Sequence, residues 1–175
     1  MPPKKAGLIH VYTGNGKGKT TASLGLALRA LGRGYRVYII QFMKGRNYGE
    51  LISKKHLKNL TISQYGSKSF IDKYNLKEKD IISAKKGLLK AQKIMTNNKY
   101  KLLILDEINC ALAWKLIKLK DVLSLIKNKP KYLELVLTGR YAHPEVRKSA
   151  DYLTVMKEGS HPYKKGIMAR KGIEY

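Results

Sequence analysis

Apolar residues follow two alternating patterns along this chain. The first pattern consists of short and nearly continuous apolar runs. They occupy residues 8–12, 37–42, 102–105 and 133–137, with weaker runs at 60–65 and 152–156. A strand that is covered on both faces needs apolar side chains on both sides, so these runs predict buried strands of a parallel sheet.

The second pattern has a helical period. Residues 20–31 are rich in Ala and Leu and lead into Gly32 and Gly34, which is typical of a helix end. Further along, apolar residues recur at steps of three and four and form one stripe on a helix. They are Ile81, Ala84, Leu88, Ala91 and Met95. Strands that alternate with helices predict an α/β domain, mostly parallel, with helices on both faces and with ligands at the carboxyl ends of the strands.

Length and composition are those of one soluble domain. The 175 residues fall within the usual size of a single domain, so residues 1–175 are expected to form one. Apolar residues make up 43% of the chain, which excludes wholesale disorder. No apolar run approaches the ~20 residues of a membrane span, and the N-terminus lacks the apolar segment of a secretory signal. With Cys110 as the only cysteine, we expect a cytoplasmic protein without disulfides or a cysteine-based metal site.

The charge balance is unusual. Thirty-six Lys and Arg residues against 12 Asp and Glu give a net charge of +24, a field that attracts polyanions. The excess is mostly Lys, scattered along a chain that is also rich in Ile, Asn and Tyr, which indicates a general compositional bias. An RNA-binding surface more often combines Arg with exposed aromatic residues. We therefore expect neither a nucleic acid nor a membrane as partner.

The sharpest local signal is the sequence TGNGKGKTT at residues 13–21. It follows an apolar run and opens a helix, as a phosphate-binding loop does. Its glycines allow several backbone N–H groups to point at one anion, and the helix N-terminus adds partial positive charge. Lys19 supplies a cation and Thr20 a hydroxyl suited to Mg²⁺. Thr13 stands where the standard pattern has its first glycine, so the loop is a variant that still predicts binding of a nucleotide or polyphosphate.

Two further signals stand at the ends of apolar runs. Asp106 and Glu107 follow one run, which places a carboxylate where Mg²⁺ would be held. The alternative is an acidic pair that only favours a helix N-terminus. Arg140 follows another run and can bind phosphate with its forked donors. The alternative is an ordinary surface arginine, but a position at the carboxyl edge of the sheet favours the functional role. Arg29, the lone charge in its helix, is either a nucleotide contact or a solvated residue.

Together these stretches resemble the ATP:corrinoid adenosyltransferases of the phosphate-loop type. The matching stretches cover nearly the whole chain in order. They are GLI at 7–9, GNGKGKTT at 14–21, ALRALG at 27–32, QFMKG at 41–45, GE at 49–50, LDEIN at 105–109, LTGR at 137–140, HPY at 161–163 and GIEY at 172–175. The family's own loop has the form GNGKGKT, which explains the missing first glycine. The resemblance implies a single phosphate-loop NTPase-like domain of the RecA-like type.

The resemblance also implies a chemistry. In this family the Co(I) of a reduced corrinoid attacks the 5′ carbon of ATP, and the products are an adenosylcorrinoid and triphosphate. The substrates are then ATP and a corrinoid, with Mg²⁺ as cofactor, in adenosylcobalamin biosynthesis or salvage. Cobalt is the nucleophile, so catalysis reduces to alignment and stabilisation of the triphosphate charge, and no catalytic side chain is expected.

The resemblance assigns residues and partners as well. Thr20 and Glu107 are implied as Mg²⁺ ligands, with Asp106 as the other candidate. Phe70 is implied to face the corrinoid, although the family's nearby Trp has no counterpart. Tyr65 or Tyr74 could replace it, or the loop could close differently. The implied ATP contacts are Gly14, Asn15, Gly16, Lys17, Gly18, Lys19, Thr20, Thr21, Arg29 and Arg140. A homodimer and an electron donor such as a reduced flavoprotein are the implied partners.

Two other functions share the phosphate loop. A nucleoside or nucleotide kinase would usually add a substrate base or an arginine-bearing lid, and it would release ADP instead of triphosphate. A nucleic-acid-dependent ATPase would fit the charge of +24 and would be stimulated by DNA or RNA at physiological salt.

Overall fold

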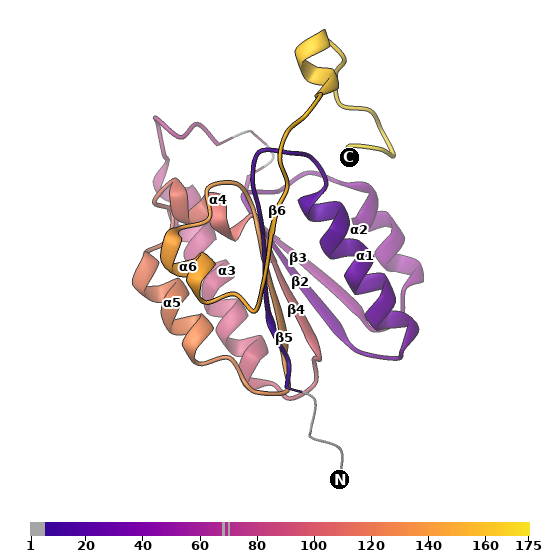
Figure 1. Ribbon diagram of the computed structural model, residues 1–175, viewed down its shortest axis with the longest axis vertical. Helices are drawn as coiled ribbons and strands as arrows, with labels where there is room; N and C mark the ends of the chain where they lie inside the picture. Colours follow the sequence, from indigo (N-terminus) through magenta and orange to yellow (C-terminus); the bar gives the residue numbers. More distant parts are fainter. Residues whose placement is uncertain (1–5, 68, 70) are drawn as a thin grey trace.

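A parallel sheet of six strands organises the computed structural model, which describes residues 6–67, 69 and 71–175 (Figure 1). The strand order is β3-β2-β4-β5-β1-β6, and every neighbouring pair is parallel. The strands are β1 (Ile9–Thr13), β2 (Val37–Phe42), β3 (Leu60–Tyr65), β4 (Leu102–Asp106), β5 (Glu134–Thr138) and β6 (Tyr152–Val155).

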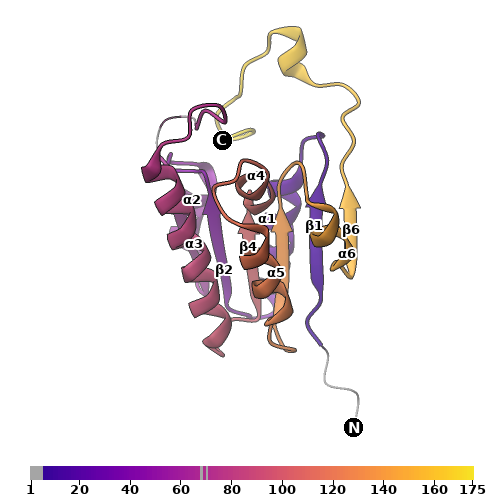
Figure 2. The ribbon, with the colours of Figure 1, turned by 90° about the vertical axis from the view of Figure 1, so that its left-hand side faces the viewer.

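Helices cover both faces of this sheet. Figures 1 and 2 show α1 and α2 on one face and α3 to α6 on the other. The helices are α1 (Lys19–Gly32), α2 (Gly49–Ser53), α3 (Glu78–Thr96), α4 (Ile108–Ala113), α5 (Leu119–Lys127) and α6 (Pro144–Lys148), with single 3₁₀ turns η1 (Lys54–His56) and η2 (Pro162–Lys165). Each face has its own apolar core, and the larger core lies under α3, α4 and α5.

The structure confirms the predicted α/β class, with a parallel sheet and helices on both faces, as in phosphate-loop NTPase-like domains. The predicted runs 37–42 and 60–65 coincide with β2 and β3, and the other runs agree within one residue at either end. The apolar stripe lies within α3, where its last four members are buried and Ile81 packs against the core. No helix among the described residues is long and apolar enough to cross a membrane.

The strand order brings the three chemical signals of the sequence together. β5 lies between β4 and β1, so the carboxyl ends of these three strands are neighbours at one edge of the sheet. The phosphate loop follows β1, the acidic pair lies at the end of β4, and Arg140 follows β5. Beyond β6, residues 156–175 rise above this carboxyl edge and turn back so that the chain ends above α1 and α2 (Figures 1 and 2). We call residues 156–175 the C-terminal strap.

Candidate functional site

The loop between β1 and α1 is shaped by the beginning of the C-terminal strap. The N–H of Gly16 donates to the carbonyl of Met156 at 2.8 Å, and the N–H of Met156 donates to the carbonyl of Thr13 at 2.8 Å. A Cβ atom at Gly14 or Gly16 would lie 2.4 or 2.5 Å from a carbonyl oxygen of the strap. Both glycines are therefore required by the close passage of a second segment of backbone.

Lys19, the first residue of α1, curls back over this loop. Its Nζ donates to the carbonyls of Gly14 at 2.7 Å and Gly16 at 2.6 Å. The side chain is buried, and this burial lowers the pKa of Lys19, while Glu107 raises it and Arg140 lowers it. The ammonium therefore lies within electrostatic reach of two other residues that the sequence predicts for the site.

Asp106 is fully buried at the end of β4 and binds side chains from three other elements. Its Oδ1 accepts from the hydroxyls of Thr20 at 2.9 Å and Thr138 at 2.7 Å. Its Oδ2 accepts from the Nζ of Lys44 at 2.7 Å, and more weakly from the Nε2 of Gln41 at 3.4 Å. Asp106 thus fixes the first turn of α1 against the sheet.

The Glu107 carboxylate has fewer hydrogen-bond partners than that of Asp106 among the described residues. Its backbone has a φ of 63° and starts α4, and its N–H donates to the Thr138 hydroxyl at 3.0 Å. Gly139 has a φ of +127°, and a Cβ atom there would lie 3.2 Å from the Glu107 Oε2. The missing side chain at Gly139 therefore gives the Glu107 carboxylate room at the end of β5.

The thiol of Cys110 lies below this carboxylate. Burial and the nearby Glu107 raise the pKa of Cys110, so the thiol stays neutral. Cys110 therefore offers neither a metal ligand nor a nucleophile at neutral pH.

The oxygens of Thr20, Asp106 and Glu107 fit a magnesium ion. Mg²⁺ prefers oxygen ligands, and it is commonly held by one or two carboxylates together with substrate phosphates and water. Within the described part of the chain, no three His, Cys, Asp or Glu side chains could enclose a metal ion by themselves. A metal at this edge would therefore depend on phosphate oxygens, which the adjacent loop is suited to hold.

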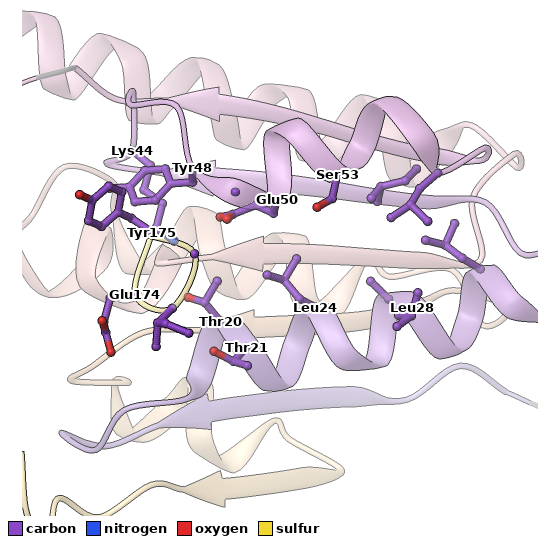
Figure 3. Close-up of a pocket in the computed structure, with 17 residues that line it drawn as sticks. Thr20, Thr21, Leu24, Leu28, Lys44, Tyr48, Glu50, Ser53, Glu174 and Tyr175 are labelled. Atoms are coloured by element: carbon purple, nitrogen blue, oxygen red, sulfur yellow. The ribbon is translucent and has the colours of Figure 1, made fainter. Parts of the chain in front are cut away.

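A cavity of about 610 Å³ opens beside the loop, between α1 and α2 (Figure 3). Its polar end carries Thr20, Thr21, Lys44 and Glu50, and its far end is lined by leucines of α1 and of the segment before β3. The last four residues of the strap form one wall of the cavity.

The strap is also tied to the loop by charge. The Glu174 carboxylate pairs with Arg170 at 3.1 Å and with Lys17 of the loop at 3.5 Å. The hydrogen bonds from Arg170 lower the pKa of Glu174 to about 2. Glu174 is therefore ionised, and it places a negative charge next to the phosphate loop.

Not every predicted contact reaches this site. Arg29 is ten residues beyond Lys19 along α1, about 15 Å at 1.5 Å per residue, and it lines a second cavity of about 600 Å³ with Arg33, Tyr35 and Lys101. The structure therefore does not bring Arg29 to the loop. Arg140 does follow Gly139 at the carboxyl edge, where it is exposed.

The positions of the remaining residues can be stated briefly. Asn15 and Lys17 are exposed on the loop, and Phe70 lies outside the described residues. Trp114 is half-buried and packs against the larger core.

Sequence reasoning missed the role of two stretches at the site. Lys44 and Gln41 both belong to the QFMKG stretch, which was noted only as part of the resemblance, yet both bind Asp106. The strap residues Glu174 and Tyr175 belong to the GIEY stretch and line the cavity. In each case the signal was a polar residue within a matching motif that had no assigned role.

Comparisons with known proteins point to one family. A family model described as ATP:corrinoid adenosyltransferase BtuR/CobO/CobP matches residues 5–175. A corrinoid adenosyltransferase of Pseudomonas aeruginosa is 33% identical over 170 residues, covering 97% of this chain and 84% of the relative. One from Sinorhizobium sp. is 34% identical over 173 residues, covering 97% and 80%. A third, from Escherichia coli K12, is 29% identical over 171 residues, covering 97% and 86%.

Proposed function

Because this chain belongs to the ATP:corrinoid adenosyltransferase family, we propose that its phosphate loop and the acidic end of β4 hold the triphosphate of ATP during adenosyl transfer. The enzyme transfers the 5′-deoxyadenosyl group of ATP to the Co(I) of a corrinoid, in cobalamin biosynthesis or salvage. The electron pair of Co(I) forms the Co–C bond. The C5′–O bond breaks, and its electron pair leaves with the triphosphate.

One observation carries the proposed site. Lys19 lies on the loop carbonyls while the neighbouring Thr20 donates to Asp106, so the loop, α1 and β4 are locked together at the carboxyl edge. The triphosphate would be held by the loop N–H groups and the α1 N-terminus, with Lys19 and Arg140 as cations. These groups act electrostatically on the leaving group, so no general base is needed.

A magnesium ion fits the same proposal. Thr20 and Glu107 would hold it, with Asp106 as the alternative carboxylate, and it would neutralise charge on the triphosphate oxygens. Thr138 would orient the Asp106 carboxylate and hold the backbone of Glu107, because its hydroxyl donates to Asp106 and accepts from the N–H of Glu107.

Three further parts of the proposal concern the surroundings of the enzyme. A homodimer is supported by β6, a sheet edge on which Tyr152, Leu153 and Val155 are exposed. An external electron donor such as a reduced flavoprotein is part of the proposal, because the single cysteine of the sequence cannot form a reducing dithiol. A cytoplasmic location is supported by the single cysteine of the sequence.

The test mixes the protein with ATP, Mg²⁺ and chemically reduced cobalamin and follows the cobalt spectrum. We expect an adenosylated corrinoid and an equal amount of triphosphate, and no product when ATP is omitted. The nucleotide products distinguish the alternative, because a kinase would release ADP. ADP formation with an unchanged cobalt spectrum would overturn the proposal.

A further inference from the structure

Lys44 has no role in the loop mechanism, although it reaches the site. We propose that Lys44 is a second triphosphate-binding lysine, which contacts the phosphates from the β2 side and stabilises the leaving group. This inference rests on the proposed function, because it concerns the same cavity and the same substrate.

The backbone directs Lys44 toward the carboxyl edge. The residue follows β2 by two positions, and Met43 between them has a φ of 60°, which is unusual for a side chain of that size. The N–H of Met43 donates to the carbonyl of Tyr65 at the end of β3, at 3.0 Å. The turn is therefore anchored to the neighbouring strand, and strained backbone of this kind often occurs at functional sites.

The ammonium of Lys44 lies at the wall of the cavity. Its Nζ is 2.7 Å from the Asp106 Oδ2 and 5.2 Å from the centre of the Tyr48 ring. The same cavity is lined by Thr20 and Thr21, which belong to the phosphate loop (Figure 3). Lys44 and Thr20 therefore both line the cavity, and each donates a hydrogen bond to a different oxygen of the Asp106 carboxylate.

The charge and the free donors of Lys44 suit a polyanion. The Lys44 ammonium forms an ion pair with the Asp106 carboxylate. An ammonium has three N–H donors. Among the described residues only Asp106 accepts a hydrogen bond from it, which leaves donors for a ligand in the cavity.

The reaction makes use of such a cation. Negative charge accumulates on the triphosphate as the C5′–O bond breaks, and a fixed cation at that point stabilises the transition state more than the ground state. Lys44 should therefore affect turnover as well as affinity.

The competing explanation is structural. Lys44 could serve only to neutralise the buried Asp106, and its loss would then leave an uncompensated charge. The Asp106→Asn background separates the two explanations, because it removes the charge that needs neutralising. The double variant also protects the test if Lys44→Met alone is too unstable to study.

The experiment measures the dissociation constant of inorganic tripolyphosphate by calorimetry, with and without Mg²⁺. We expect Lys44→Met to weaken binding about tenfold or more in both the original and the Asp106→Asn backgrounds. Lys44→Arg should retain most of the affinity. The matched control is Lys120→Met, which removes one exposed charge from α5, on the opposite face of the sheet. Turnover with Co(I) supplied ready-made should show a lower kcat for Lys44→Met and an unchanged kcat for Lys120→Met.

Each outcome decides one question. If Lys44→Met costs nothing in the Asp106→Asn background, the inference is overturned and Lys44 only neutralises Asp106. If Lys19→Ala loses tripolyphosphate binding while Lys44→Met keeps it, the inference fails and the proposed function stands. If neither variant loses affinity, the proposed triphosphate site itself is wrong.

Discussion

The side chains of Lys19 and Lys129 both donate hydrogen bonds to backbone carbonyls, at opposite edges of the sheet. The Nζ of Lys19 donates to two loop carbonyls at the carboxyl edge. The Nζ of Lys129 donates to the carbonyls of Gly7, Pro130 and Leu133 at the amino edge. Burial lowers the pKa of both lysines. The hydrogen bonds of the two side chains therefore do not reveal which lysine serves a ligand.

The surroundings of the two lysines differ. Around Lys19 lie glycine N–H groups and a helix N-terminus, so an anion can replace the carbonyl partners. Around Lys129 lie the carboxylates of Glu134 and Asp151, both of which raise its pKa, and Glu134 itself is fixed by His10 and the N–H of Leu8. The comparison teaches that the groups around a buried lysine decide its role. Neighbouring N–H donors allow the lysine to bind an anionic ligand, whereas neighbouring carboxylates restrict it to a structural role.

The largest expected effect separates the two lysines. Lys19→Ala should weaken ATP binding at least about tenfold, since a charge-assisted contact contributes roughly 1.5–3 kcal/mol. Its melting temperature should change by only a few degrees, because the substitution removes two side-chain hydrogen bonds to loop carbonyls and leaves both apolar cores intact. Calorimetry with ATP and thermal melting are the measurements.

Lys129→Ala is the matched variant for this prediction. It should leave ATP affinity unchanged and cost about 1 kcal/mol of stability, a figure reduced for its partial exposure to solvent. For a chain of this size that lowers the Tm by about 2–4 °C. If both variants lost ATP affinity equally, the proposed difference between a ligand-binding Lys19 and a structural Lys129 would be wrong.

The next effect concerns the carboxylates at the Lys19 edge. Glu107→Gln keeps the size but removes charge from the proposed Mg²⁺ site, so turnover should fall about tenfold and recover in part at high Mg²⁺. Turnover is measured as a function of Mg²⁺ concentration. Recovery seen with Asp106→Asn and not with Glu107→Gln would mean that Asp106 is the ligand.

A smaller effect is expected for Glu134 at the Lys129 edge. Burial works to raise its pKa, but hydrogen bonds from His10 and the Leu8 N–H hold the pKa of Glu134 below its usual value. Its contribution to stability is therefore complete above the unfolded pKa, about 4.3, and is lost as the pH falls below it. Glu134→Gln should lower the Tm by a few degrees at pH 5, and the difference should shrink at pH 3. A difference that grows toward low pH would contradict this assignment.

The smallest effect is expected for Glu174. Its exposed ion pair with Lys17 places a negative charge where triphosphate would bind. Glu174→Gln should therefore raise ATP affinity by less than about fivefold at low salt. The gain should vanish near 1 M salt, where screening acts within about 3 Å. Calorimetry at two salt concentrations measures it, and a gain that persists at high salt would rule out a charge effect.

The sequence predicted the central strands well because β2, β4 and β5 are almost entirely buried and read as continuous apolar runs. The two weaker runs form the edge strands β3 and β6, and β6 is exposed along its length. The sequence also predicted the phosphate loop and the acidic pair, since both are local signals. It could not predict that Gln41 lies beside Asp106, because this depends on the lateral pairing of β2 with β4. The position of Lys44 on Asp106 depends on the same pairing.

Arg29 shows a different limit. The resemblance implies a nucleotide contact for Arg29, but a matching motif does not say how far the residue lies from the loop. The helical rise alone separates it from Lys19 by about 15 Å. The short helices α2, α4 and α6 were also missed, because five or six residues are too few to establish a helical period.

The place of β1 in the sheet has a consequence for how the protein is made. β1 leaves the ribosome before the other five strands of the sheet, yet it lies between β5 and β6, which come later in the chain than β2, β3 and β4. Its loop also packs against Met156 and Lys157. A nascent chain that ends before β6 can pair β2, β3, β4 and β5, but its phosphate loop still lacks the contacts with Met156 and Lys157. We therefore expect the proposed ATP site to be completed late in translation, after β6 has paired with β1 and the start of the strap has bonded to the loop.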